Sequence, residues 1–119
     1  MPDPIHPLLP MLRATLVSLE RLSMVANDPR IQRLLRARRR ALAADRTPLP
    51  AIRRPRPGED VEFDAMIAAE WKLARRLAAV AATLPQDDPE RERMDRLRTE
   101  IEDAALTLRL VARRFDAQK

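Results

Sequence analysis

The sequence predicts an all-α protein, a four-helix bundle-like domain made of two antiparallel helical hairpins joined by a proline- and arginine-rich linker. Apolar residues near the C-terminus alternate at spacings of three and four, which is typical of a helix packed along a partner helix. This seam consists of Met94, Leu97, Ile101, Ala104, Leu108, Val111 and Phe115. Two Asp-Pro pairs mark helix starts, and three aromatic residues in 119 leave little material for a sheet.

The length and composition fit one domain, residues 1–119, in a reducing compartment. A chain of 119 residues buries one modest helical core. There is no cysteine, so disulfides and thiolate metal sites are excluded and a cytoplasmic location is expected. The first ten residues lack the pattern of a secretory signal, and no uncharged stretch approaches the roughly 20 residues of a membrane helix. We therefore expect a soluble protein without membrane insertion.

The first hairpin is predicted from residues 7–26 and 29–44. The first of these helices carries an apolar face of Leu8, Leu12, Leu16, Leu19 and Leu22. Asp28 can cap the second helix with its carboxylate, and Pro29 fits the first helical position because its φ is already fixed there. The connection between the helices is short, so we expect them to lie antiparallel.

A linker at residues 45–59 separates the two hairpins. Four prolines forbid a helix here and favour extended polyproline geometry, which rises about 3.1 Å per residue. Such a segment reaches roughly 35 to 40 Å. It is long enough to cross the whole length of a bundle, so the second hairpin need not begin where the first one ends.

The second hairpin is predicted from residues 61–84 and 89–116. Asp60 is the expected cap of the third helix and Pro85 its stop, while Asp88 is the expected cap of the fourth. The third helix is apolar over a wide arc, which indicates contacts with the fourth helix on one side and with the first hairpin on the other. We expect it to be the central helix.

Positive charge is concentrated in one segment. Between Asp28 and Pro57 ten arginines stand against two aspartates, giving +8, so the rest of this +5 chain carries −3. Such a segment can bind a nucleic-acid backbone or an acidic partner. A solvated helix face followed by a linker would show the same pattern, and arginine exceeds lysine 21 to 2 throughout the chain. The candidate binding residues are Arg33, Arg36, Arg38, Arg39, Arg40, Arg53, Arg54 and Arg56.

Two residues of the third helix and three of the fourth are candidates for burial or for partner contact. Glu70 lies on an apolar stripe, where a buried carboxylate needs a partner, so we expect it to pair with an arginine of the second or fourth helix. The large apolar residues assigned to core packing or to a partner-binding face are Trp71, Leu106, Leu110 and Phe115.

The sequence offers no catalytic constellation. It has one histidine, His6, in the proline-rich lead-in, and one glycine, which rules out a glycine-rich phosphate loop. We expect no enzyme activity, cofactor, metal or small-molecule substrate. The favoured interpretation is a non-enzymatic helical interaction protein, a small subunit or adaptor that docks on a larger assembly through its long hairpin, with a protein partner or a homo-oligomer.

Two alternatives use the arginines of residues 30–56. In the first, the protein binds a nucleic-acid backbone or is a small subunit of a nucleoprotein complex, with affinity that falls steeply with salt. In the second, the arginine-rich linker lies on a membrane surface that contains anionic lipid.

Overall fold

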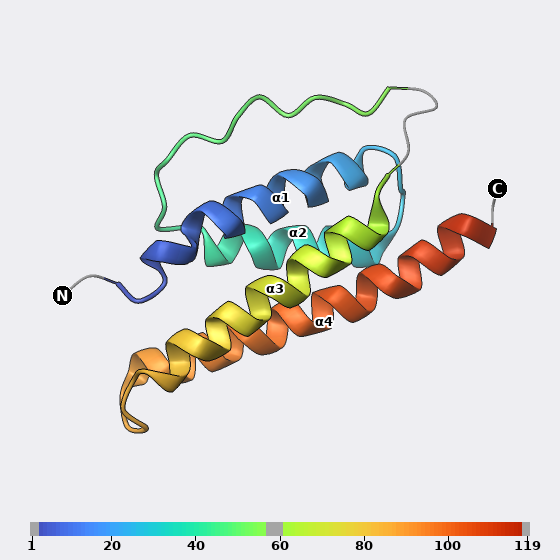
Figure 1. The fold of residues 1–119 in the computed structure, drawn as a ribbon. Coiled ribbons are helices and arrows are strands. Elements are labelled where there is room, and N and C mark those ends of the chain that lie inside the picture. Colours follow the sequence, from blue (N-terminus) through green and yellow to red (C-terminus); the bar gives the residue numbers. More distant parts are fainter. Residues whose placement is uncertain (1–2, 57–60, 118–119) are drawn as a thin grey trace.

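The computed structural model describes residues 3–56 and 61–117, and in these ranges every regular element is helical. A 3₁₀ turn, η1 (His6–Leu8), leads into α1 (Leu9–Ser23), which is followed by α2 (Pro29–Ala41), α3 (Phe63–Ala82) and α4 (Pro89–Ala117). Figure 1 shows α1 paired with α2 and α3 paired with α4. The predicted all-α class and its two antiparallel hairpins are therefore confirmed.

The two predicted Asp-Pro helix starts form as expected. Asp28 is extended, at φ −130° and ψ 123°, because the residue before a proline is disfavoured in helical geometry. Its Oδ1 accepts a hydrogen bond from the Arg30 amide at 2.9 Å, and the Glu90 amide donates to Asp88 Oδ1 at the same distance. Each carboxylate thus satisfies a backbone donor that has no partner within its helix.

The helix ends differ from the prediction by one to three residues. The first helix ends at Ser23 rather than at residue 26, and the second at Ala41 rather than at residue 44. After Ala41 the chain closes in tighter turns, in which the Asp45 amide donates to the Leu42 carbonyl at 3.0 Å. Such i→i−3 bonds commonly finish a helix.

The start of α3 departs from the expected cap. Asp60 lies outside the described residues, and the residue that precedes α3 is Glu62, whose side chain makes no capping hydrogen bond. At its other end α3 stops at Ala82, three residues before Pro85. There the Thr83 hydroxyl donates to the Val80 carbonyl at 2.6 Å.

The four helices are packed in a ring in which every neighbouring pair is antiparallel. In the described part of the chain α1 contacts α2 and α3, while α4 contacts α3 and α2, and the most extensive packing is between α3 and α4. Helix α3 therefore touches both α4 and the first hairpin, as its wide apolar arc predicted. None of the described helices is long and apolar enough to cross a membrane.

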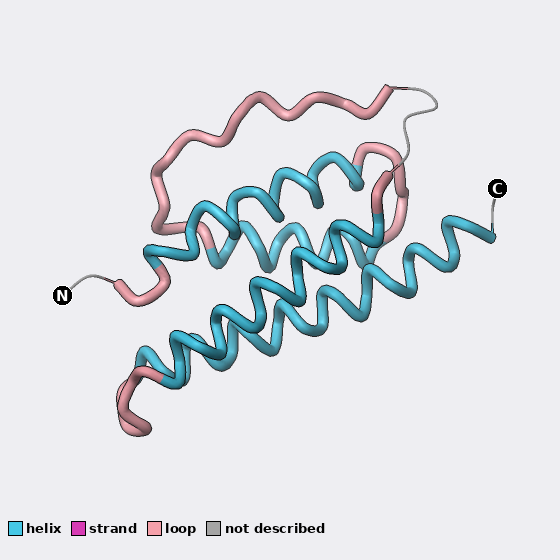
Figure 2. The backbone as a smooth tube through the Cα atoms, viewed as in Figure 1, coloured by secondary structure: helices cyan, strands magenta, loops and turns pink. Residues whose placement is uncertain are grey.

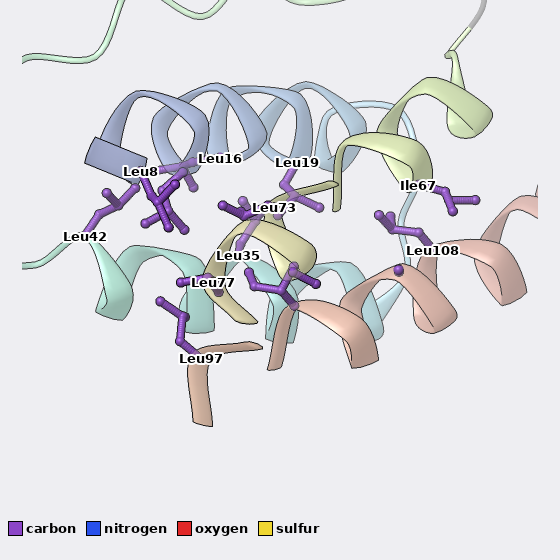
Figure 3. Packing of buried hydrophobic residues seen from close by; sticks show 14 of the residues in the cluster. Leu8, Leu16, Leu19, Leu35, Leu42, Ile67, Leu73, Leu77, Leu97 and Leu108 are labelled. Atoms are coloured by element: carbon purple, nitrogen blue, oxygen red, sulfur yellow. The ribbon is translucent and has the colours of Figure 1, made fainter. Parts of the chain in front are cut away.

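The core lies along the axis of this ring. Figure 3 shows leucines from all four helices pointing inward, among them Leu19, Leu35, Leu73 and Leu108. The predicted seam of α4 is buried from Met94 to Val111. The last residue of the seam, Phe115, is partly buried, and its ring lies 5.5 Å from that of Phe63, tilted by 57°.

Residues 45–56, here called the strap, run extended along the outer side of α1 from the end of α2 towards the start of α3 (Figures 1 and 2). The described part of the predicted linker, residues 45–56, is therefore extended and runs lengthwise along the first hairpin. Its beginning is held by an ion pair between Arg13 of α1 and Asp45, with 2.5 Å between Nη1 and Oδ2. The hydrogen bond from Arg13 lowers the pKa of Asp45 below its usual value.

Candidate functional site

Three arginines form an exposed row on α2. Arg33, Arg36 and Arg40 recur at spacings of three and four, so they lie on one face of the helix over about 10 Å. That face is opposite the one that carries the buried Ile31 and Leu35. None of the three forms a hydrogen bond or an ion pair with another residue in the described ranges 3–56 and 61–117.

Arg38 is not part of this surface, which corrects its prediction as a binding residue. Its side chain is only 3% exposed, and its guanidinium donates in bidentate fashion to Glu70 of α3, with distances of 3.0 Å to Oε1 and 2.5 Å to Oε2. Arg38 also donates to the hydroxyl of Thr15, which in turn donates to the Leu12 carbonyl at 3.0 Å. The prediction that Glu70 pairs with an arginine of the second or fourth helix is confirmed, and the partner lies on α2.

Arg39 lies at the surface but has a partner. Its Nε donates to Oε1 of Glu20 in α1 at 2.9 Å, and Nη2 donates to the same oxygen. With 53% of its side chain exposed, Arg39 can still meet solvent. An ion pair this exposed contributes little to folding.

The predicted arginine set is divided between two places. Arg53, Arg54 and Arg56 are exposed on the strap, which lies outside α1. Arg40 instead borders a groove between α2 and α4. Arg40 of the row therefore lies beside α4, whereas the strap arginines lie outside α1.

The groove beside Arg40 contains two arginines that the sequence reasoning missed. It has a volume of about 690 Å³, with Ala37 and Leu97 on its walls and Arg40, Arg93 and Arg96 among its polar groups. Arg93 is partly neutralised because it lies 3.3 Å from Asp3 and 2.8 Å from Glu90. No signal in the linear sequence joins these residues to the α2 row, because their proximity arises only when α4 packs beside α2.

The four large apolar candidates fall into two groups. Trp71 and Phe115 are partly buried against the core, as expected for packing residues. Leu106 and Leu110 are 50% and 51% exposed, on the side of α4 opposite the fully buried Leu108. The last two therefore present an apolar surface to solvent.

The remaining polar features of the described residues are a hollow beside α1 and the ion-paired cap of α2. In the described ranges no group of three or more histidine, aspartate, glutamate or cysteine side chains is placed to hold a metal ion. A hollow of about 500 Å³ between α1, the strap and α3 combines apolar side chains such as Leu22 and Met66 with the carboxylate of Glu62. The hydrogen bonds from Arg30 lower the pKa of Asp28 to about 2, which is the effect of an ion-paired helix cap.

These features define an all-α protein with an exposed arginine row on one hairpin and an exposed leucine pair on the other. Comparison of the chain with protein-family models, with curated proteins and with solved structures finds no match.

Proposed function

We propose that this chain is a non-enzymatic helical interaction protein, a small subunit or adaptor that docks on a protein partner through the outer face of its long hairpin. The observation that carries the proposal is the exposed pair of Leu106 and Leu110 on α4. Fully burying a leucine is worth about 1.5 to 3 kcal/mol. Covering the exposed half of each of these side chains would therefore contribute favourably to binding.

The position of the pair supports docking by a helix. Leu106 and Leu110 are separated by four residues, so they lie one turn apart on the same side of α4, which is the spacing of anchor residues in helix-to-helix recognition. Both are well inside α4 rather than at its ends. The partner would meet a preformed surface, which lowers the entropic cost of binding.

The test is capture of a partner by the immobilised protein and by two variants. Leu106→Glu together with Leu110→Glu replaces the apolar pair by carboxylates. Leu49→Glu is the matched control, since Leu49 is an exposed leucine of the strap, at 38%. We expect a protein that binds the wild type and the Leu49 variant but not the double variant. A partner that binds all three forms equally would overturn the proposal.

A second candidate function, binding of a nucleic-acid backbone, is favoured by the row of Arg33, Arg36 and Arg40. Their exposure on a rigid helix suits phosphate contacts, which position a protein on nucleic acid without reading its sequence. Three such contacts on duplex DNA give a slope of about −2.7 in log K against log salt concentration. Affinity should then fall about 40-fold between 50 and 200 mM salt.

This candidate is tested by neutralising the row and, separately, an equal number of cations elsewhere. The first variant changes Arg33, Arg36 and Arg40 to Gln. The control changes Lys72, Arg75 and Arg76, which are exposed on α3, to Gln. Loss of DNA binding only in the first variant would support the row, whereas equal loss in both would show that net charge alone attracts the DNA.

A further inference from the structure

Helix α4 carries a second seam on its outer side, in addition to the one that faces the core. Its residues recur at spacings of four and three, and all of them are exposed. The outer seam consists of Thr99, Asp103, Leu106, Leu110, Arg113 and Ala117. These spacings are the a and d positions of a heptad, at which one helix packs against another.

The charges on this outer seam are arranged about its centre. Asp103 lies three residues before Leu106, and Arg113 lies three residues after Leu110. Neither charged residue forms an ion pair with another residue in the described part of the chain. Both pairs, the leucines and the charges, are centred on residue 108. Two copies of the seam that run in opposite directions would therefore place leucine against leucine and aspartate against arginine.

We propose that the outer seam of α4 binds the same seam of a second copy of the chain, with the two helices antiparallel about a two-fold axis near residue 108. In that arrangement Leu106 faces Leu110 of the other copy, and Asp103 faces its Arg113. The symmetry forms each contact twice, as in any isologous dimer. This inference rests on the proposed function, because it assigns a partner to the same two leucines.

Charge selects the antiparallel arrangement over a parallel one. In a parallel arrangement, Asp103 of one copy would lie beside Asp103 of the other, and the two Arg113 side chains would also meet. Like charges in contact are destabilising. The antiparallel arrangement replaces these repulsions by two symmetry-related ion pairs. At the flanks, Glu100 and Arg114 of opposite copies also come within reach of each other.

The size of the seam indicates a weak, concentration-dependent dimer. Residues 99–117 span about 27 Å of helix, and only four leucines form the apolar centre of the pair. The two copies of Arg109 would approach each other beside the axis, which opposes association. This is the scale of transient interfaces, and we expect a dissociation constant on the order of 10 to 100 µM.

Analytical ultracentrifugation of the full chain, from 5 to 500 µM at low ionic strength, tests the proposal. Asp103→Arg places a second positive charge against Arg113 of the other copy, so we expect the dimer to weaken at least tenfold. Adding Arg113→Asp to the same chain exchanges the two charges and should restore the affinity. Circular dichroism checks that the helices remain formed in each variant.

Glu92→Arg is the matched control, because it makes the same charge change on the same side of α4 but beyond the overlap of the two copies. The Glu92→Arg variant should dimerise with the same dissociation constant as the wild type. A chain that stays monomeric at 500 µM overturns the inference, as does a dimer that Asp103→Arg leaves unchanged or that the exchanged pair fails to restore.

These outcomes separate the inference from the proposed function. If the chain is monomeric but the variant with Leu106→Glu and Leu110→Glu still loses a captured protein, the docking function stands and the second copy is the wrong partner. If the chain is monomeric and that variant captures the same proteins as the wild type, both proposals fail.

Discussion

Arg38 and Glu70 join the two hairpins through the interior of the protein. Their bidentate contact bridges α2 and α3, which lie diagonally across the ring and have no backbone packing contact within the described residues. Side chains this deeply buried, at 3% and 2% exposure, are tolerated because each charge is neutralised and hydrogen-bonded by the other. The pair therefore links one hairpin to the other by a direct contact between side chains.

Glu70→Ala should lower the free energy of unfolding by about 3 to 5 kcal/mol, because it leaves the guanidinium of Arg38 buried without a counter-charge. Urea-induced unfolding followed by circular dichroism measures this loss. Replacing both partners, with Arg38→Met and Glu70→Leu, removes the uncompensated charge and should cost far less than the single change. A Glu70→Ala variant as stable as the wild type would mean that the pair is solvated.

Arg39→Ala tests an exposed ion pair and should cost much less stability than Glu70→Ala, which breaks a buried one. Arg39 is the next residue along α2, but its ion pair with Glu20 is exposed to solvent. We expect the free energy of unfolding to change by less than about 0.5 kcal/mol in the same urea experiment. A larger loss would show that the Glu20 contact matters more for folding than its exposure suggests.

Truncating Leu108 on the inner seam of α4 should lower the free energy of unfolding much more than truncating Leu106 on the outer seam. Leu108→Ala should cost about 2 to 5 kcal/mol because it opens a cavity in the core, whereas Leu106→Ala on the outer seam should stay within about 0.5 kcal/mol. Leu108→Pro should unfold the protein because it also breaks the helix. Thermal and urea unfolding at low protein concentration, where any dimer is dissociated, give these values.

Asp28 should make stability depend on pH in the acid range. Its pKa of about 2 in the folded state lies below the ordinary value of 3.8, so the unfolded chain binds the proton more readily. The contribution of this carboxylate is therefore complete above about pH 5 and is lost as the pH falls towards 2. Asp28→Asn keeps a capping side chain but cannot titrate. The stability difference between wild type and variant should shrink between pH 6 and pH 2.5 in urea unfolding.

The ion pair between Arg13 and Asp45 should protect the strap from proteolysis. Arg13→Ala releases the beginning of the strap, so we expect faster tryptic cleavage after Arg46 and Arg53 while global stability changes little. Asp3→Asn, which removes an exposed ion pair between the N-terminal segment and α4, is the control and should leave the rate unchanged. Equal cleavage of wild type and Arg13→Ala would show that the strap is not held by this contact.

Periodicity predicted most of the fold because burial in this protein follows helical faces closely. The inner seam of α4 is buried where it was expected, and the Asp28 and Asp88 caps start their helices at the predicted residues. The prediction that Glu70 pairs with an arginine also followed from pattern, since a carboxylate on an apolar stripe must be neutralised.

The candidate sites were predicted less completely because they depend on three-dimensional packing. Arg38 and Arg39 are adjacent in the same basic run, yet one is buried and the other exposed, and the difference is a rotation of about 100° around α2. Arg96 was missed for the opposite reason, since it lies far from that run in sequence and reaches the groove only through the packing of α4.

The surface position of the strap bears on how the two hairpins are held together. It passes along the outside of α1 and lies largely at the surface, so its main contribution is to keep the hairpins at a high effective concentration for each other. A chain cut within the strap should therefore still reassemble from two separate pieces, each a hairpin. The affinity of these pieces would then measure directly how strongly the first hairpin binds the second.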